Sequence, residues 1–452
     1  MAETKIIVLD DDPTGSQTVH SCLLLTRWDV DTLKTGLLDT APLFFVLTNT
    51  RGMDAKSAET LTREVCINLK QALNELASEG REINPLVVSR SDSTLRGHYP
   101  VETDVIAEEL GPFDAHFMVP AFFEGGRFTV DSVHYLMVDG EPVPVHQTEF
   151  ANDSVFAYSH SYLPDYVEEK TKGRIKSNDV VRFQLYDVRN DSLAKLMGLS
   201  GNQCCVVDSE TQDDLNHFCH QLMQAASLGK RFLFRSAASL LTALAQLPPQ
   251  PVKAEQMNQY VRNGKPGVII VGSHVKKTTQ QLSVLFDTPG IIPVKVDVER
   301  IGNDENLLDN IIEKITSLHQ QGINAVVFTS RTEKTFDSQA ERLAFGVQVS
   351  EFLMDVVRHL PKTLGFLISK GGITSNDVLS TGLSLTSSRV VGQILPGCSV
   401  VRCPGDHELY PELPVVIFPG NVGDEYSLAK AFNYLTQQES SVLPSHTAGS
   451  AA

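Results

Sequence analysis

Short apolar runs alternate with helical patterns along most of the 452-residue chain. The first half contains six such runs, bounded by polar or turn-forming residues: KIIVLD, LFFVLTNT, PLVVSRSD, AHFMVP, QCCVVDS and RFLFRS. Between the second and third runs, residues 56–78 place apolar side chains at intervals of three and four, as on one face of a helix. This order predicts βαβ units with mainly parallel sheets, which is an α/β fold.

A polar, proline-bearing stretch follows Leu247, and a second series of apolar runs begins after it: GVIIVGS, IIPVKVDV, NAVVFTS, LGFLISKGG, SVVRCP and PVVIFPG. Residues 304–321 carry the matching helical pattern. We therefore predict two lobes, each a mainly parallel sheet flanked by helices.

The predicted boundaries follow from these breaks in the pattern, with domains at 1–247 and 268–436, a linker at 248–267 and a disordered tail at 437–452. Residues 121–180 are richer in loops, Tyr and His, which indicates an insertion or a β-arm instead of a wound βα unit.

Composition narrows the classes of partner. With 55 acidic and 38 basic residues, the net charge of −17 argues against a nucleic-acid or anionic-membrane surface. No run approaches the ~18 apolar residues of a membrane span, and MAETKIIVLD does not resemble a signal peptide, so we expect a cytoplasmic protein without a membrane partner. The seven scattered cysteines fit neither a disulfide framework nor a zinc site, and we expect them to be reduced and mostly structural.

The first apolar run ends in three carboxylates, Asp10, Asp11 and Asp12, before a turn at Pro13. This pattern predicts a buried parallel strand whose carboxyl end opens into a site. Adjacent like charges are costly unless a cation or substrate compensates them, although a solvated acidic turn is the alternative. Alternation along the strand would place Asp10 and Asp12 on one face and Asp11 on the other, unless the turn at Pro13 breaks the pattern.

Two further strand ends carry charged and hydroxyl groups. SRSDSTLRGH, residues 89–98, brings Asp92, Ser93 and Arg96 together, and TNTRG supplies Arg51. An arginine fork suits a carboxylate or phosphate, and neighbouring hydroxyls can bind polyol oxygens. An Asp–Arg ion pair that holds a loop is the alternative. Because strand ends of a parallel sheet meet at one edge, these groups predict a site for a small anionic, hydroxylated substrate.

Glycines mark four strand ends of the second lobe: VGSHVKKT, SKGGITSNDV, LPGCS and FPGNVGDE. Glycine lets backbone N–H groups approach a phosphate, so we favour a nucleotide site over ordinary βα turns. GSHVKKT is not a P-loop, because Lys277 stands where the second glycine belongs.

Asp10-x-Asp12-x-Thr14 also fits the opening of aspartyl-phosphate phosphatases, in which the first Asp attacks phosphorus. Such enzymes commonly bind Mg²⁺ through a later Gly-Asp with a second Asp four residues on. Here Asp406 is followed by Tyr410, and Asp424 only by Glu425, so the match is partial.

Several motifs occur in an order that resembles the four-carbon acid sugar kinase family: DDDPTGSQTVH, TNTRG, SDSTLRG, PAFFEGGRFTVDSVHY, SHSYLPDYVEEKT, GSHV, KGGITSNDV and FPGNVGDE. The resemblance implies an N-terminal lobe for a sugar acid, a C-terminal lobe for ATP and an active site in the cleft between them. Members of that family phosphorylate the terminal hydroxyl of threonate, erythronate or 3-oxo-tetronate.

The resemblance also implies ligand contacts. It places ATP against Ser273, Gly371, Gly372, Ile373, Thr374 and Gly420. It places the acid near Asp12, Thr14, Asp92, Ser93 and Arg96. DDDPTG stands where many members read ADDLTG, and KGGITSND where many read GGDTA, so this chain resembles a divergent branch and its substrate is less defined than its reaction.

The resulting hypothesis is an ATP-dependent sugar-acid kinase assisted by Mg²⁺. Asp12 or Asp92 would orient and deprotonate the attacking hydroxyl, and Arg96 with Arg51 would hold the substrate carboxylate. Asp11 is a further candidate for binding the substrate. The metal ligands stay unassigned, and a homodimer is possible. The alternatives are the phosphatase and a non-catalytic sugar-acid sensor.

Overall fold

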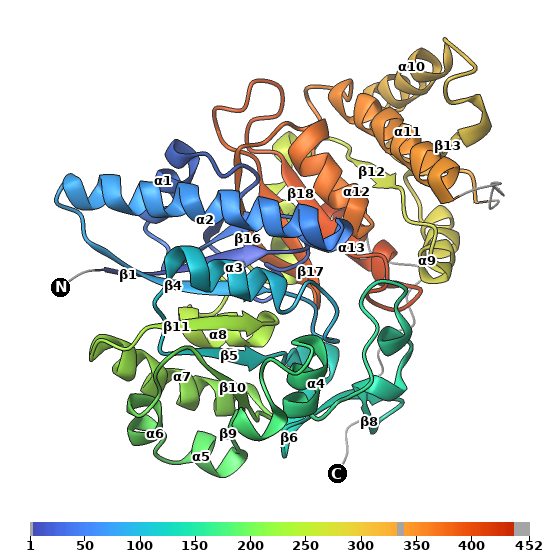
Figure 1. The fold of residues 1–452 in the computed structure, drawn as a ribbon. Coiled ribbons are helices and arrows are strands. Elements are labelled where there is room, and N and C mark those ends of the chain that lie inside the picture. Colours follow the sequence, from blue (N-terminus) through green and yellow to red (C-terminus); the bar gives the residue numbers. More distant parts are fainter. Residues whose placement is uncertain (1–2, 332–338, 438–452) are drawn as a thin grey trace, which may run out of the picture. The chain divides into compact units, whose positions relative to one another are not determined.

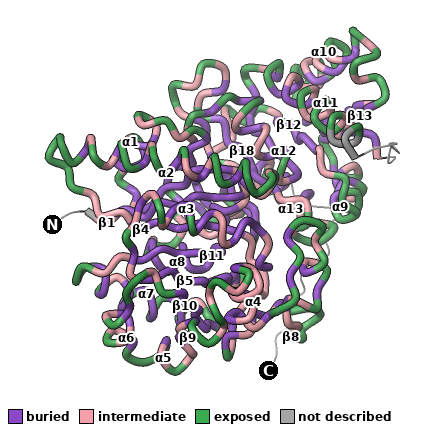
Figure 2. The backbone as a smooth tube through the Cα atoms, in the orientation of Figure 1, coloured by how far each residue is buried: buried purple, intermediate pink, exposed green. Residues whose placement is uncertain are grey.

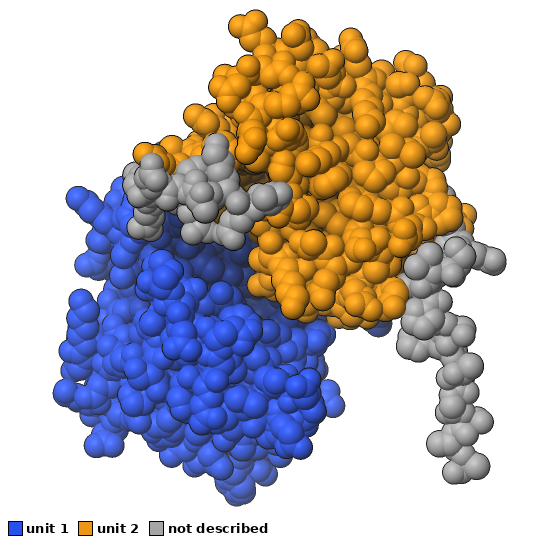
Figure 3. Space-filling model, turned by 90° about the vertical axis from the view of Figure 1, so that its right-hand side faces the viewer, with its two compact units in different colours: residues 1–250, 386–390 blue, residues 251–385, 391–452 orange. Residues whose placement is uncertain are grey.

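The structure, a computed structural model, describes residues 3–331 and 339–437 (Figure 1). The chain divides into two compact units (Figure 3). Unit 1 comprises residues 1–250 and 386–390, and unit 2 comprises residues 251–385 and 391–452. The tail predicted at 437–452 lies outside the described residues from residue 438 onward. Each unit contains a mainly parallel sheet with flanking helices, which confirms the predicted α/β class.

The sheet of unit 1 has the strand order β16-β2-β3-β1-β4-β11-β5-β10-β9. Its pairs are parallel except for β16 with β2. The strands are β1 (Glu3–Asp10), β2 (Cys22–Leu25), β3 (Leu43–Leu47), β4 (Ile83–Arg90), β5 (Ala115–Val119), β9 (Val181–Phe183), β10 (Gln203–Val207), β11 (Phe232–Ser236) and the first residues of β16 (Ser387–Leu395). The helices are α1 (Val30–Leu38), α2 (Ala55–Ser78), α3 (Val101–Leu110), α4 (Leu163–Lys170), α5 (Leu185–Arg189), α6 (Leu193–Met197), α7 (Gln212–Ser227) and α8 (Ala238–Ala245).

The register of the central strands brings their carboxyl ends level. Asp10 pairs with Leu47 of β3 and with Arg90 of β4, and Arg90 in turn pairs with Ser236 of β11. The strands are buried along most of their length (Figure 2), as their apolar runs predict. The charged residues that end these runs therefore meet at one edge of the sheet.

Helix α2 confirms the periodicity seen at residues 56–78. Its N-cap, Asp54, accepts hydrogen bonds from the backbone N–H groups of Lys56 and Ser57, each over 3.0 Å. The face that carries Val65 and Leu69 is buried against the sheet and neighbouring helices. The cap and the apolar stripe together account for its beginning and its orientation.

Residues 121–180 contain a separate antiparallel sheet of three strands, β6 (Arg127–Val130), β7 (Val133–Val138) and β8 (Glu141–Pro144). We call residues 121–180 the arm. The arm confirms the expectation that this region departs from the βα pattern.

The sequence patterns missed β2 and β16. β2 has only four residues, and its antiparallel partner lies far along the chain. The pairing is reinforced by Arg389, which donates to both oxygens of Asp39 over 2.9 and 2.6 Å. Pairing between such distant segments produces no local hydrophobic pattern, so the sequence does not predict it.

The sheet of unit 2 has the order β13-β14-β12-β15-β18-β17-β16. The first five strands are parallel, and β17 runs antiparallel to β18. The strands are β12 (Val268–Val271), β13 (Ile291–Val296), β14 (Asn324–Thr329), β15 (Leu367–Lys370), β17 (Cys398–Arg402) and β18 (Pro414–Phe418). The helices are α9 (Lys276–Phe286), α10 (Leu307–Gln320), α11 (Gln339–Arg358), α12 (Gly372–Asp377) and α13 (Ser427–Thr436), and α10 matches the pattern at 304–321.

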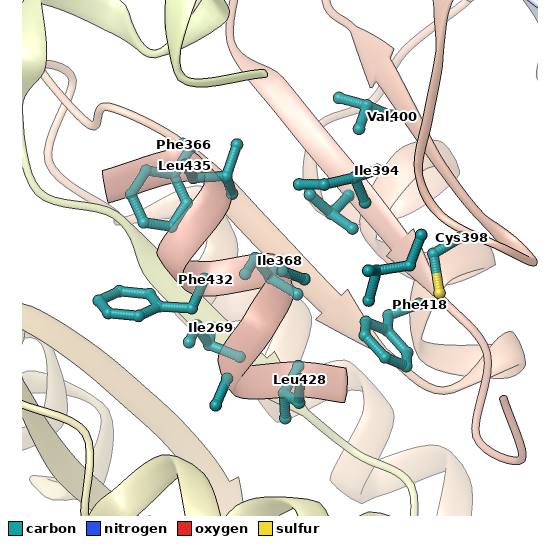
Figure 4. Packing of buried hydrophobic residues seen from close by; sticks show 14 of the residues in the cluster. Ile269, Phe366, Ile368, Ile394, Cys398, Val400, Phe418, Leu428, Phe432 and Leu435 are labelled. Atoms are coloured by element: carbon teal, nitrogen blue, oxygen red, sulfur yellow. The ribbon is translucent and has the colours of Figure 1, made fainter. Parts of the chain in front are cut away.

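The core of unit 2 packs α13 on its strands, with Phe432 beside Ile269 and Ile368 (Figure 4). Met257, which falls in the segment predicted as a linker, is fully buried in the same core. The end of that segment thus folds as part of unit 2, through short 3₁₀ turns. All seven cysteines are buried, and none of them forms a disulfide in the structure.

Candidate functional site

Asp10, the last residue of β1, is fully buried. Its Oδ1 accepts a hydrogen bond from Arg90 Nη1 at 3.3 Å, while Oδ2 has no partner among the described residues. A Cβ at Gly15 would lie 1.9 Å from Oδ2, so the turn after β1 closes over this carboxyl only because residue 15 is glycine. Burial, together with the charges of Asp11 and Asp12, raises the pKa of Asp10 to about 7 in spite of Arg90.

Asp11 and Asp12 both contact Arg51, which follows β3. Arg51 donates to Asp11 from Nη2 over 2.5 Å and from Nε over 3.2 Å, and its Nη1 lies 3.3 Å from Asp12 Oδ2. The alternation of faces does not extend to Asp11 and Asp12, because β1 ends at Asp10 and the turn before Pro13 breaks the pattern. Asp11 is only 2% exposed and also accepts from the Ser91 hydroxyl at 2.8 Å.

Asp12 is the most accessible of the three carboxylates, with 21% of its side chain exposed. Its Oδ1 accepts hydrogen bonds from the backbone N–H and the hydroxyl of Thr14. Burial would raise the pKa of Asp12, but the charges of Arg51 and Arg90 and the Thr14 hydrogen bonds lower it overall. Asp12 is thus an ionised, partly open carboxylate at neutral pH.

Asp92 and Arg96 form the ion pair that the sequence offered as an alternative to a ligand site. Arg96 Nε donates to Asp92 Oδ2 at 2.7 Å, and the Thr94 hydroxyl donates to the same oxygen. Although burial opposes it, the charges of Arg51 and Arg96 hold the pKa of Asp92 well below its usual range. Arg96 also lies 3.8 Å from Asp153 and packs over the Phe150 ring, so both arginines predicted to hold the substrate already have acidic partners in the chain.

The arm supports the loop that carries Asp92. His134 Nε2 donates to the Ser93 carbonyl over 2.8 Å, and the hydroxyls of Tyr158 and Tyr166 donate to the carbonyls of Thr94 and Leu95. Burial lowers the pKa of His134 to about 4, so its ring is neutral and its Nδ1 accepts from a neighbouring hydroxyl. These three side chains were not among the predicted site residues.

A second buried ion pair, between Arg235 and Glu102, lies at this edge of the sheet. Arg235, at the end of β11, donates to Glu102 over 2.9 Å, and the Thr50 hydroxyl donates to the other Glu102 oxygen over 2.6 Å. Arg235 could have been noticed, because it ends an apolar run as Arg90 does. Glu102 lies in α3, and no strand-end pattern points to it.

In unit 2 the residues predicted to bind ATP come together. A Cβ at Gly371 would lie 3.1 Å from Ser273 Cβ and from Thr374 Oγ1, and a Cβ at Gly420 would lie 3.1 Å from Ser273 Oγ. Gly371 also adopts a φ of 123°, which favours glycine. Gly372 opens α12, and Ile373 is 72% exposed. The loops that follow β12, β15 and β18 therefore pack closely together at the carboxyl ends of these strands. Glycine-bearing strand ends of this kind can bind a phosphate chain through backbone N–H groups.

Two cations of unit 2 lie at the same strand ends. Lys370 is fully buried, and its Nζ donates to the carbonyls of Pro419 over 2.5 Å and Gly420 over 3.2 Å. Burial lowers the pKa of Lys370 to about 7. Arg331 Nη1 donates to the Ser273 carbonyl over 2.6 Å. Neither residue was among the predicted site residues, although Lys370 stands immediately before the two glycines.

Comparison with known proteins identifies both parts of the chain. Residues 6–244 match the sugar-binding N-terminal domain, and residues 268–428 match the nucleotide-binding C-terminal domain. The chain therefore belongs to the four-carbon acid sugar kinase family, which confirms the resemblance seen in its motifs.

One relative and two solved structures match the chain almost from end to end. A D-erythronate kinase from Heliobacterium modesticaldum is 24% identical and covers 96% of this chain and 97% of its own. A Salmonella typhimurium LT2 protein, provisionally named a tRNA synthase, has 18% identity, a TM-score of 0.70 and coverage of 95% of this chain and 99% of its own. Haemophilus influenzae protein HI1011 has 17% identity, a TM-score of 0.65 and coverage of 95% and 100%. The structures show a shared fold, and the named relative indicates a kinase.

No helix in residues 3–331 or 339–437 has the length and apolar character needed to cross a membrane.

Proposed function

We propose that the protein is an ATP-dependent kinase that phosphorylates the terminal hydroxyl of a small sugar acid such as threonate, erythronate or 3-oxo-tetronate. The observation that carries the proposal is the close approach of Gly371 and Gly420 to Ser273 in unit 2. A phosphatase or a sugar-acid sensor would have no use for such a surface, whereas a kinase needs one for the nucleotide phosphates.

In this proposal unit 1 handles the acceptor hydroxyl. Asp12 orients that hydroxyl and takes its proton, because it is ionised and the most accessible of the three adjacent carboxylates. Arg51 keeps Asp12 ionised, and Asp11 fixes the orientation of Arg51. Asp92 is the second candidate for the base. The Thr14 hydroxyl, which donates to Asp12, and Ser93, the neighbour of Asp92 in the chain, would supply groups for polyol oxygens.

Unit 2 would hold ATP against Ser273, residues 371–374 and Gly420. Lys370 orients the Pro419–Gly420 backbone through its two hydrogen bonds. Mg²⁺, when bound, neutralises phosphate charge, and it is usually held by one or two carboxylates together with the phosphates themselves.

The phosphatase alternative conflicts with the position of Asp10. A nucleophile must reach phosphorus, yet Asp10 is fully buried beneath Gly15 and beside Arg90. A cytoplasmic location would suit a reaction between ATP and a free small acid, and both a monomer and a homodimer are compatible with it.

The test is incubation of the purified chain with ATP, Mg²⁺ and a panel of four- to six-carbon sugar acids, with ADP formation as the readout. The proposal expects ADP that depends on the acid and is greatest for a four-carbon acid. ADP formation with none of these acids would refute the kinase assignment.

A further inference from the structure

Arg127, the first residue of β6, occupies an unusual position in the arm. Its Nη1 donates to the Gly125 carbonyl over 2.5 Å, and its guanidinium lies over the Phe122 ring, 5.8 Å from the centroid. A Cβ at Gly125 would lie 2.1 Å from Nη1, so glycine at this position leaves room for the guanidinium. The local structure thus holds the side chain in one place.

Arg127 forms no ion pair with any residue that the structure describes. Its Nε is buried and lacks a hydrogen-bond partner within that part of the chain. Burial lowers the pKa of Arg127, although the charge of Asp92 opposes this. A partly buried cation without a counter-ion is costly, and an anionic ligand that supplies the missing charge reduces that cost.

Arg127 belongs to the same region as the candidate site of unit 1. Strand β6 pairs with β7, so Arg127 lies opposite Leu136, and Thr129, two residues further along β6, lies opposite His134. The charges of Asp92, Arg96 and Glu149 also affect the pKa of Arg127. In β7, His134 donates a hydrogen bond to the Ser93 carbonyl. The charges of Arg127 and Asp92 also affect the pKa of His134. Arg127 therefore lies near the loop that carries Asp92.

Arg51, Arg96 and Arg127 differ in the partners that they already have within the chain. Arg51 is bound to Asp11 and Asp12, and Arg96 is bound to Asp92. Arg127 has only a backbone carbonyl as its hydrogen-bond partner among the described residues. An incoming carboxylate would have to compete with the chain's own carboxylates at Arg51 and Arg96, but not at Arg127.

We propose that Arg127 binds the carboxylate of the sugar acid and so selects acids over neutral polyols. The inference rests on the proposed function and deepens it, because it identifies the residue that recognises the acid. A carboxylate at this position accepts from the guanidinium fork, including the Nε that the chain leaves unpaired. Arg96 then has a different task, which is to hold Asp92 in its loop.

The experiment compares Arg127→Met and Arg127→Lys with wild type in the full chain. The expected result for Arg127→Met is an apparent KM for D-erythronate about 10- to 100-fold higher, with the KM for ATP unchanged, since a hydrogen-bonded charge pair typically contributes this much. Arg127→Lys keeps the charge but loses the fork, so its KM should be intermediate. Arg63→Met, which removes an arginine from the exposed surface of α2, is the matched control.

Calorimetric titration with D-erythronate and with erythritol, which lacks the carboxylate, separates recognition from folding. In Arg127→Met the affinity for D-erythronate should fall toward the affinity for erythritol. ATP binding and the melting temperature should stay near wild type. An unchanged KM or an unchanged preference for the acid would overturn the inference, and so would equal weakening of both ligands. Because this titration needs no turnover, it tests Arg127 even if wild type forms no ADP, which would refute the proposed function separately.

Discussion

Arg51 donates to both carboxylate oxygens of Asp11, from Nη2 to Oδ1 over 2.5 Å and from Nε to Oδ2 over 3.2 Å. Its remaining nitrogen, Nη1, lies 3.3 Å from Asp12. One guanidinium thus joins the end of β1 to the loop that follows β3 and compensates two adjacent charges. The acidic run after β1 is stable in the fold because arginines from neighbouring strand ends face it.

Arg51→Met should destabilise the protein strongly. Asp11 is 2% exposed and would lose its closest cation, and removing one partner of a buried pair typically costs about 3–5 kcal/mol of unfolding free energy. Urea denaturation measures this loss. Arg63→Met is the control, because the partners of Arg63 are more exposed than Asp11 and solvent screens such surface pairs. Equal losses in the two variants would contradict the role given to Arg51.

Asp12→Asn should lower kcat by about 10²–10⁴-fold, the usual contribution of a positioned general base, and leave ATP binding nearly intact. Steady-state kinetics and calorimetry with ATP measure the two effects. Asp10→Asn should be milder, because the buried Asp10 contacts Arg90 and the turn instead of the substrate. A fully active Asp12→Asn variant would remove Asp12 from the reaction.

Asp10→Asn should also change how stability depends on pH. The pKa of Asp10 rises from 3.8 to about 7 in the folded protein, so folding favours the protonated form. Its stabilising contribution is therefore complete below pH ~4 and is lost as the pH rises through about 7. The melting temperature of Asp10→Asn relative to wild type should be higher at pH 8 than at pH 5. A difference that does not vary with pH would contradict the raised pKa.

Gly372→Val should weaken ATP binding and leave sugar-acid binding intact. The substitution adds a branched side chain at the start of α12, where the proposal has backbone approaching phosphate. Gly346→Val is the control in the same unit, because a Cβ at Gly346 meets no atom within 4 Å. Calorimetry that shows wild-type ATP affinity in Gly372→Val would exclude this loop from the nucleotide site.

The meeting of charged residues at one edge of the sheet in unit 1 could be predicted from the sequence. The apolar runs of the first half end at Asp10, at Arg90 and just before Arg51. Parallel strands bring such ends together, and the register confirms that they do. The contacts of Asp11 and Asp12 could not be predicted, since strand alternation stops where β1 stops. Strand alternation therefore predicts side-chain directions only as far as Asp10, the last residue of β1.

The residues that the sequence did not reveal act through tertiary contacts. His134 and Arg127 belong to the arm, and Glu102 belongs to a helix, so none of them ends a strand of the main sheet. Arg127 stands within a motif that resembles the family, but its lack of an acidic partner is visible only once the described residues are placed in space. Periodicity identifies elements, whereas charge balance at a site depends on which elements meet.

The most direct test of the central claim follows the γ-phosphoryl group. The purified chain is incubated with Mg²⁺, D-erythronate and ATP labelled in that group, and the label is traced by chromatography and by acid precipitation of the protein. Our account predicts label in the sugar acid, formed in equal amount to ADP, with none on the protein. Label in an acid-stable, hydroxylamine-sensitive phosphoenzyme, or no transfer to any four- to six-carbon sugar acid, would contradict it.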